Sequence, residues 1–147
     1  MMAQLRKLLM HLQPAKPALP SPDIGTCEHG IWELRGQTPR YFIWEEVVSV
    51  KIVWSENPWG DPFCGPYCDT EWLVESRSGE RMFAWDDEQT RRAILPAFEK
   101  YLPGYSFDYI SFDEAHKGRT FQLDGGEHLT WSRAGKAQLE AHDPPMP

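Results

Sequence analysis

Three cysteines and one histidine are the side chains of this 147-residue chain best suited to hold a metal ion. Cys64 and Cys68 form a Cys-x-x-x-Cys pair, and Cys27 and His29 form a Cys-x-His pair. Thiolates and imidazole in a tetrahedral arrangement suit zinc, and both spacings are tolerable for such a site. Neither is the common Cys-x-x-Cys knuckle, so we expect unligated thiols, buried or half-buried, and no cofactor.

A second set of polar residues has the chemistry of nucleophiles, acids and bases. It comprises Ser111, Asp113, Glu114 and His116, together with His29 and His128 in predicted strands. Proximity along the chain does not bring a nucleophile and a base within hydrogen-bond distance. The sequence has no nucleophile elbow, phosphate-binding loop or metalloprotease motif. We therefore expect these polar residues to form turns and to lie on the surface, and we expect that the protein is not an enzyme. The alternative is a metal-stabilised or catalytic domain of unknown substrate.

Residues 55–68 set aromatic side chains among prolines, glycines and acids, which rules out regular strand or helix. Loops of this length are uncommon unless they are functional or disordered. Aromatic side chains in a loop stiffened by prolines anchor interfaces at a small entropic cost. The alternative is that the rings fold back over the open end of a sheet. The candidate partner-binding residues are Glu56, Trp59, Asp61, Phe63, Tyr67, Asp69 and Glu71.

The net charge of −7 is concentrated in one stretch of the chain. Residues 55–88 hold nine acids and two bases, whereas the remainder holds thirteen of each. Such a stretch can form a negative field that attracts a basic partner and accelerates encounter. It can also be a solvated face that keeps the protein soluble. Nucleic-acid binding is disfavoured because phosphate contacts need clustered Lys and Arg.

Strands are predicted in the first half of the chain. Residues 31–34, 41–44 and 47–54 are rich in β-branched and aromatic side chains, and the third segment alternates apolar and mixed positions. Residues 72–74 and 82–85 predict a hairpin with Gly79 at its turn. A second hairpin is predicted from residues 118–121 and 128–131.

A helix is predicted after the first hairpin, with Asp86 or Asp87 as its cap and Ile94, Phe98, Tyr101 and Leu102 on its buried stripe. Pro96 should kink this helix or delay its start. Strands followed by a long helix favour an α+β fold.

The predicted organisation has four parts. Residues 1–12 place leucines at helical spacing and predict a short N-terminal helix, followed by a Pro-rich linker at 13–26. Residues 27–133 form the α+β domain, and residues 134–147 a flexible tail. An odd number of cysteines and no uninterrupted apolar N-terminal stretch favour a reducing, cytoplasmic compartment. Arg6 and Lys7 alone would give at most marginal membrane attachment.

The order of elements resembles the pleckstrin-homology-like small proteins of bacteria. The residues that carry this resemblance are Ile43 to Val48, Glu71 to Val74, and Leu95 to Tyr105. The resemblance implies a strongly bent antiparallel sheet closed by one main helix. The N-terminal helix and the second hairpin depart from that pattern.

The chain is also similar to some bacterial immunity proteins in size, acidity and lack of catalytic motifs. That similarity implies a protein-binding module that neutralises a partner with a basic surface.

Overall fold

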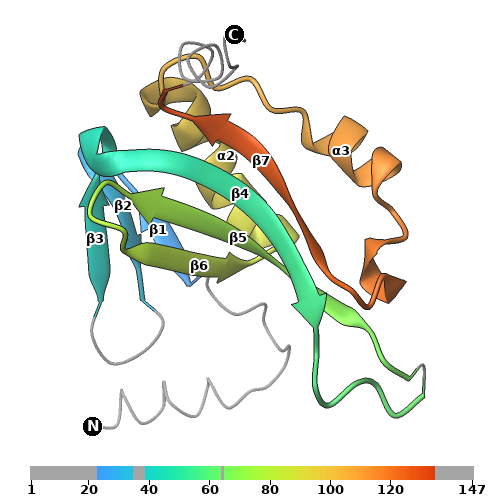
Figure 1. Ribbon diagram of the computed structural model, residues 1–147. Helices are drawn as coiled ribbons and strands as arrows, with labels where there is room; N and C mark the ends of the chain where they lie inside the picture. Colours follow the sequence, from blue (N-terminus) through green and yellow to red (C-terminus); the bar gives the residue numbers. More distant parts are fainter. Residues whose placement is uncertain (1–22, 35–38, 64, 135–147) are drawn as a thin grey trace, which may run out of the picture.

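The computed structural model describes residues 23–34, 39–63 and 65–134 of the chain (Figure 1). This part contains two antiparallel sheets and two α-helices, so the predicted α+β class is confirmed. The elements are β1 (Ile24–Thr26), β2 (Gly30–Glu33), β3 (Arg40–Ile43), the 3-10 turn η1 (Trp44–Glu46), β4 (Val47–Glu56), β5 (Cys68–Ser76), β6 (Arg81–Trp85), α2 (Glu88–Tyr101), α3 (Tyr109–Ala115), the 3-10 turn η2 (Arg119–Phe121) and β7 (Gly126–Ser132). The predicted helix at 1–12 and the tail after residue 134 lie outside the described residues.

The larger sheet has the strand order β6-β5-β4-β7. Its strands form because apolar and polar side chains alternate, which gives each strand one face to bury. Ile52 lies opposite Trp72 in the β4–β5 ladder, and both side chains are fully buried. The predicted hairpin of β5 and β6 is confirmed, and Gly79 adopts the positive φ of 92° that its turn requires.

The smaller sheet has the order β1-β2-β3 and begins earlier than expected. The predicted linker extended to residue 26, but Ile24–Thr26 pairs with β2 and Ile24 is buried. These residues follow the last proline of the linker, so their backbone amides are available to a ladder. Gly25 also permits close packing, because a Cβ atom there would lie 2.5 Å from the Trp32 ring.

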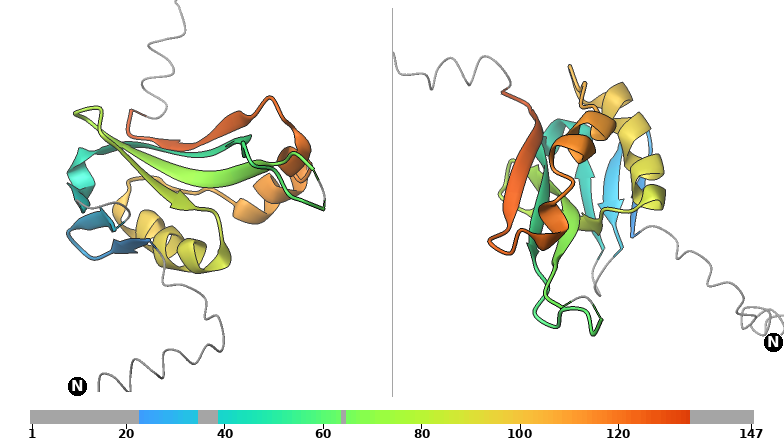
Figure 2. Two further views of the ribbon diagram at one scale, coloured as in Figure 1. Left: turned by 90° about the horizontal axis from the view of Figure 1, so that it is seen from below. Right: turned by 90° about the vertical axis from the view of Figure 1, so that its right-hand side faces the viewer.

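Both helices and the smaller sheet lie on one side of the larger sheet (Figure 2). α2 contributes Phe98, whose ring lies 6.3 Å from that of Trp72 and 6.1 Å from that of Trp44. α3 contributes Phe112, which packs against Trp54 of β4. The other side of the larger sheet carries no helix within the described part of the chain.

α2 follows the predicted boundaries. The Asp87 side chain accepts a hydrogen bond of 2.8 Å from the Thr90 amide, which caps the helix, and Leu102 follows the last helical residue. Pro96 lies inside the helix and does not delay its start, which is at Glu88.

Two sequence-based expectations are corrected. The strongly bent sheet closed by one helix is not confirmed, since the described residues form two sheets and no closed barrel, and the larger sheet is not strongly curled. The 3-10 turn η1 lies between β3 and β4, which belong to different sheets. The second hairpin is confirmed only in its second strand, since residues 128–131 are part of β7; residues 119–121 form η2, and β7 pairs with the long strand β4.

The two sheets are linked by side chains that bond to the backbone of β6. A carboxylate oxygen of Glu33 accepts a hydrogen bond from the Phe83 amide at 3.3 Å, and Glu33 is buried. The Arg40 guanidinium donates to the carbonyl of Arg81. These contacts hold the edge of the larger sheet against β2 and β3.

No helix among the described residues is long and apolar enough to cross a membrane.

Truncation of Phe98 to Ala should lower the free energy of unfolding by about 3–5 kcal/mol, because its buried ring joins α2 to the larger sheet. Chemical denaturation of wild-type and variant protein measures this change. The matched control is Phe121→Ala, since 66% of Phe121 is exposed and its removal should have little effect. An equal loss in both variants would contradict the assignment of the core.

Candidate functional site

The connection between β4 and β5 extends beyond the body of the protein and forms its most prominent projection (Figure 1). We call residues 55–69 the β4–β5 arm. It contains the ends of both strands and most of the candidate binding residues. Cys64 within it lies outside the described residues.

Asn57 organises the root of the arm. Its backbone amide donates to the Tyr67 carbonyl at 2.8 Å, and its side-chain nitrogen lies 3.1 Å from the Tyr67 hydroxyl and 2.8 Å from a carboxylate oxygen of Asp69. Its side-chain oxygen accepts from the Trp59 amide at 2.8 Å. Tyr67 is half-buried in these contacts, so it belongs to the root of the arm and not to an exposed surface.

The tip of the arm is held by a second set of hydrogen bonds. Asp61 and Gly65 exchange two backbone hydrogen bonds of 2.8 Å each. The Asp61 carboxylate also accepts a 2.6 Å hydrogen bond from the Phe63 amide. Gly60 and Gly65 both have positive φ, which lets the chain turn twice within this short segment. The tip therefore has a defined backbone shape.

Two aromatic side chains project from this hydrogen-bonded frame. Trp59 is 90% exposed and Phe63 is 94% exposed. The alternative that the rings fold back over the sheet is therefore wrong for Trp59 and Phe63. Large apolar side chains that stay exposed on an ordered backbone are typical of interaction surfaces.

The acidic stretch at 55–88 is divided between two regions. Glu56 is exposed at the end of β4, and Asp69 and Glu71 lie on the side of β5 away from the core. By contrast, Asp86 is buried and Asp87 caps α2. Only the first part of the stretch contributes negative charge to the arm and to the adjoining sheet.

The candidate metal ligands are not brought together among the described residues. Cys27 is exposed beside β1, whereas Cys68 is buried at the start of β5, where its thiol lies 3.2 Å from the Gln122 carbonyl. Burial and the charges of Glu56 and Asp69 raise the pKa of the Cys68 thiol. His29 contacts Glu28, and no group of three potential ligands occurs in the described segments.

Four candidate catalytic residues, Ser111, Asp113, Glu114 and His116, lie on or next to α3. His128 lies on β7 as predicted, whereas His29 lies in the turn between β1 and β2 and not in a strand. The Ser111 hydroxyl donates to Asp108, the residue that caps α3. Asp113 pairs with Arg119 at 2.9 Å, and Glu114 pairs with Lys117 at 3.3 Å. The carboxylate that accepts from Ser111 also accepts from the amides of Ile110 and Ser111, so this contact belongs to the cap of α3.

The two histidines near this helix are packed among aromatic rings. The His116 ring lies 4.8 Å from that of Phe112 and 5.6 Å from that of His128. Burial and the proximity of His116 lower the pKa of His128. These histidines support the packing of α3 against β7.

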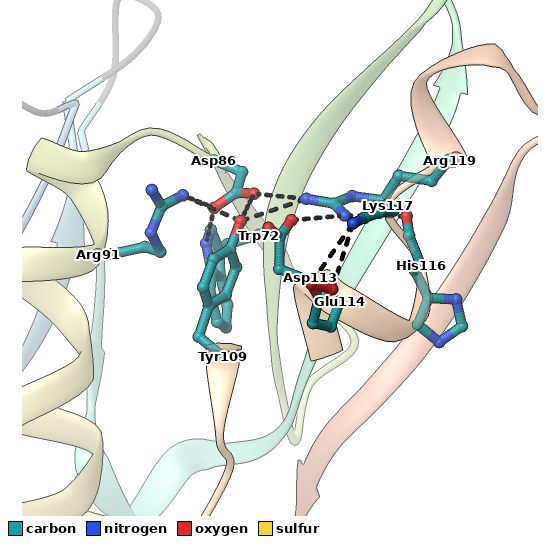
Figure 3. Close-up of polar contacts among 9 residues, drawn as sticks. All are labelled: Trp72, Asp86, Arg91, Tyr109, Asp113, Glu114, His116, Lys117 and Arg119. Atoms are coloured by element: carbon teal, nitrogen blue, oxygen red, sulfur yellow. Dashed lines mark hydrogen bonds and ion pairs between the residues drawn. The ribbon is translucent and has the colours of Figure 1, made fainter. Parts of the chain in front are cut away.

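A buried charge network that the sequence did not indicate centres on Asp86 (Figure 3). The Asp86 side chain is 2% exposed and accepts hydrogen bonds from Arg91 at 2.6 Å, Tyr109 at 2.8 Å and the Trp72 indole at 3.0 Å. Arg119 approaches it at 3.5 Å. Burial and the bond to Asp86 raise the pKa of Tyr109 to about 12. Because its oxygens are bonded to four groups, Asp86 is placed for structure and not for proton transfer.

No family model, curated protein or solved structure matches this chain.

Replacement of Asp86 by Asn should lower the free energy of unfolding by about 3–5 kcal/mol, because Arg91 and Arg119 would lose the charge that compensates them in a buried site. Urea denaturation measures the change. Asp113→Asn is the matched control, since the Asp113 side chain is 51% exposed and its pair with Arg119 is screened by water. A comparable loss in the control would show that burial of Asp86 is not the cause.

Proposed function

We propose that this protein is a protein-binding module whose β4–β5 arm contacts a partner with a basic surface, as an immunity-type inhibitor does. The observation that carries the proposal is the exposure of Trp59 and Phe63 on a hydrogen-bonded arm. An inhibitor of this kind needs no catalytic group. It acts by covering the working surface of its partner.

The energetics of the arm support this role. Burying a large apolar side chain contributes about 1.5–3 kcal/mol, and both rings forgo that contribution in the free protein. The hydrogen bonds of Asn57 and Asp61 already order the arm, so binding would cost little further backbone entropy. A complex would therefore gain most of the burial energy of the two rings.

The charges near the arm support a basic partner. Glu56 and Asp69 lie at the root of the arm and Glu71 just beyond it, and a negative surface of this kind accelerates encounter with a positive one. A cytoplasmic location is part of the same proposal, because the thiols would remain reduced there.

Trp59→Ala should weaken binding by about 30-fold or more, as for a central tryptophan of an interface. The free energy of unfolding should change by less than about 0.5 kcal/mol, because the ring is exposed in the free protein. The partner is isolated on immobilised wild-type protein and identified by mass spectrometry. Its affinity for each variant is then measured by calorimetry, and inhibition is tested in an assay of the partner's activity.

Ile110→Ala is the matched control for this experiment, because Ile110 is 75% exposed but lies on α3. It should leave affinity unchanged. The proposal is overturned if Trp59→Ala binds as tightly as wild type, or if both variants lose affinity equally.

Glu56→Lys should lower the association rate severalfold at low salt, and the difference should shrink as salt is added. We choose Glu56 because Asp61 and Asp69 accept hydrogen bonds that shape the arm. Stopped-flow mixing measures the rate. Glu80→Lys makes the same charge change at the exposed β5–β6 turn and should leave the association rate close to that of the wild type. Equal association rates for the wild type and both variants at low salt would exclude steering by the arm.

A further inference from the structure

A hollow of about 540 Å³ lies at the end of the β4–β5 pair remote from the arm. Strands β4, β5 and β7 and the residues just after them form its walls. Its polar lining consists of Ser49, Lys51, Glu75, Arg77, Ser132 and Arg133. Hollows of this size are typical of sites for small molecules.

Two arginines of the hollow are held in place by one segment of backbone. Arg77 follows β5 and donates from Nε to the Glu45 carbonyl at 3.2 Å. Arg133 follows β7 and donates from Nε to the Val47 carbonyl at 2.9 Å and from Nη2 to the Trp44 carbonyl at 2.6 Å. The turn η1 and the start of β4 therefore fix both guanidinium groups before any ligand arrives.

Within the described residues, no ion pair compensates the charge of these two arginines. Neither guanidinium lies within 4.0 Å of a carboxylate oxygen in the described residues. Burial and the charge of Arg77 together lower the pKa of Arg133, although Glu45 acts in the opposite direction. Both arginines line the same hollow, and two positive charges that face one site favour the binding of an anion there.

The acid that lines the hollow is already engaged. Glu75 accepts a 2.7 Å hydrogen bond from the Ser49 hydroxyl and lies 3.6 Å from both Lys51 and Arg81. Burial alone would raise the pKa of Glu75, but these contacts outweigh it and the pKa is lowered. Lys51 is shared between Glu75 and Glu127, so the arginines supply most of the free positive charge.

We propose that this hollow binds the oxyanion group, phosphate or carboxylate, of a small molecule. Guanidinium groups present paired N–H donors whose geometry matches the oxygens of either group. Ser132, which lies opposite Ser49 in the β4–β7 ladder, adds a hydroxyl to the lining. The site lies away from the β4–β5 arm and does not depend on the function proposed for the arm.

The test is a titration of isotopically labelled full-length protein with inorganic phosphate and, separately, with succinate, followed by amide chemical shifts. We expect saturable shifts at Ser49, Arg77, Ser132 and Arg133 with at least one of the two anions. The anion that binds more tightly identifies the ligand group. Arg77→Gln should weaken that binding at least about tenfold, because it removes one of the two fixed cations.

Arg77 is the residue of choice because it is exposed, whereas loss of Arg133 removes two bonds to the backbone and would affect folding. Arg92→Gln makes the same charge change on α2, where Arg92 pairs with Glu88, and should bind as wild type does. Absence of saturable shifts with both anions overturns the proposal. It is equally overturned if Arg77→Gln and Arg92→Gln bind alike, since the anion would then respond only to net charge.

Discussion

The arrangement of helices and strands depends most on the hydrogen bonds and ion pairs of the buried Asp86 carboxylate. Asp86 follows β6 directly, and its hydrogen-bond donors come from β5, from α2, from α3 and from η2. An unpaired carboxylate in such a site would be strongly unfavourable, so the four donors must assemble around it together. The position of η2 in turn determines where the chain returns to form β7 on the edge of β4.

The long strand pair of β4 and β5 carries both candidate binding surfaces, and β7 completes one of them. β4 and β5 run through the centre of the larger sheet, with the arm at one end and the basic hollow at the other. Trp72 and Ile52 fix the pair in the core between these ends. The arm needs only the hydrogen bonds of Asn57 and Asp61, whereas the hollow is complete only when β7 has brought Arg133 beside Arg77. Local contacts therefore form the first surface, and tertiary assembly forms the second.

This distinction matches what could be predicted from the sequence. The β5–β6 hairpin and α2 follow from local signals: alternation, Gly79 at the turn, and Asp87 as cap. The exposure of Trp59 was left open, because residue type alone does not show whether a ring has a partner. α3 was missed because it is only seven residues long, although Asp108 before Tyr109 and Phe112 was an available signal. A strand at 128–131 was predicted, but its pairing with β4 and the bonds of Asp86 to Tyr109 and Arg119 could not be, since these partners lie far away in the sequence.

The contacts of Glu33 and Arg40 with the backbone of β6 affect the behaviour of the molecule in a crowded solution. A bare edge strand offers amides and carbonyls to any other extended chain, and this is how folded sheets begin to aggregate. Here the Phe83 amide and the Arg81 carbonyl are occupied by charged side chains of the smaller sheet. A second molecule would have to displace the buried carboxylate of Glu33 before it could extend the sheet at this edge. The junction of the two sheets therefore protects the protein against aggregation through β6.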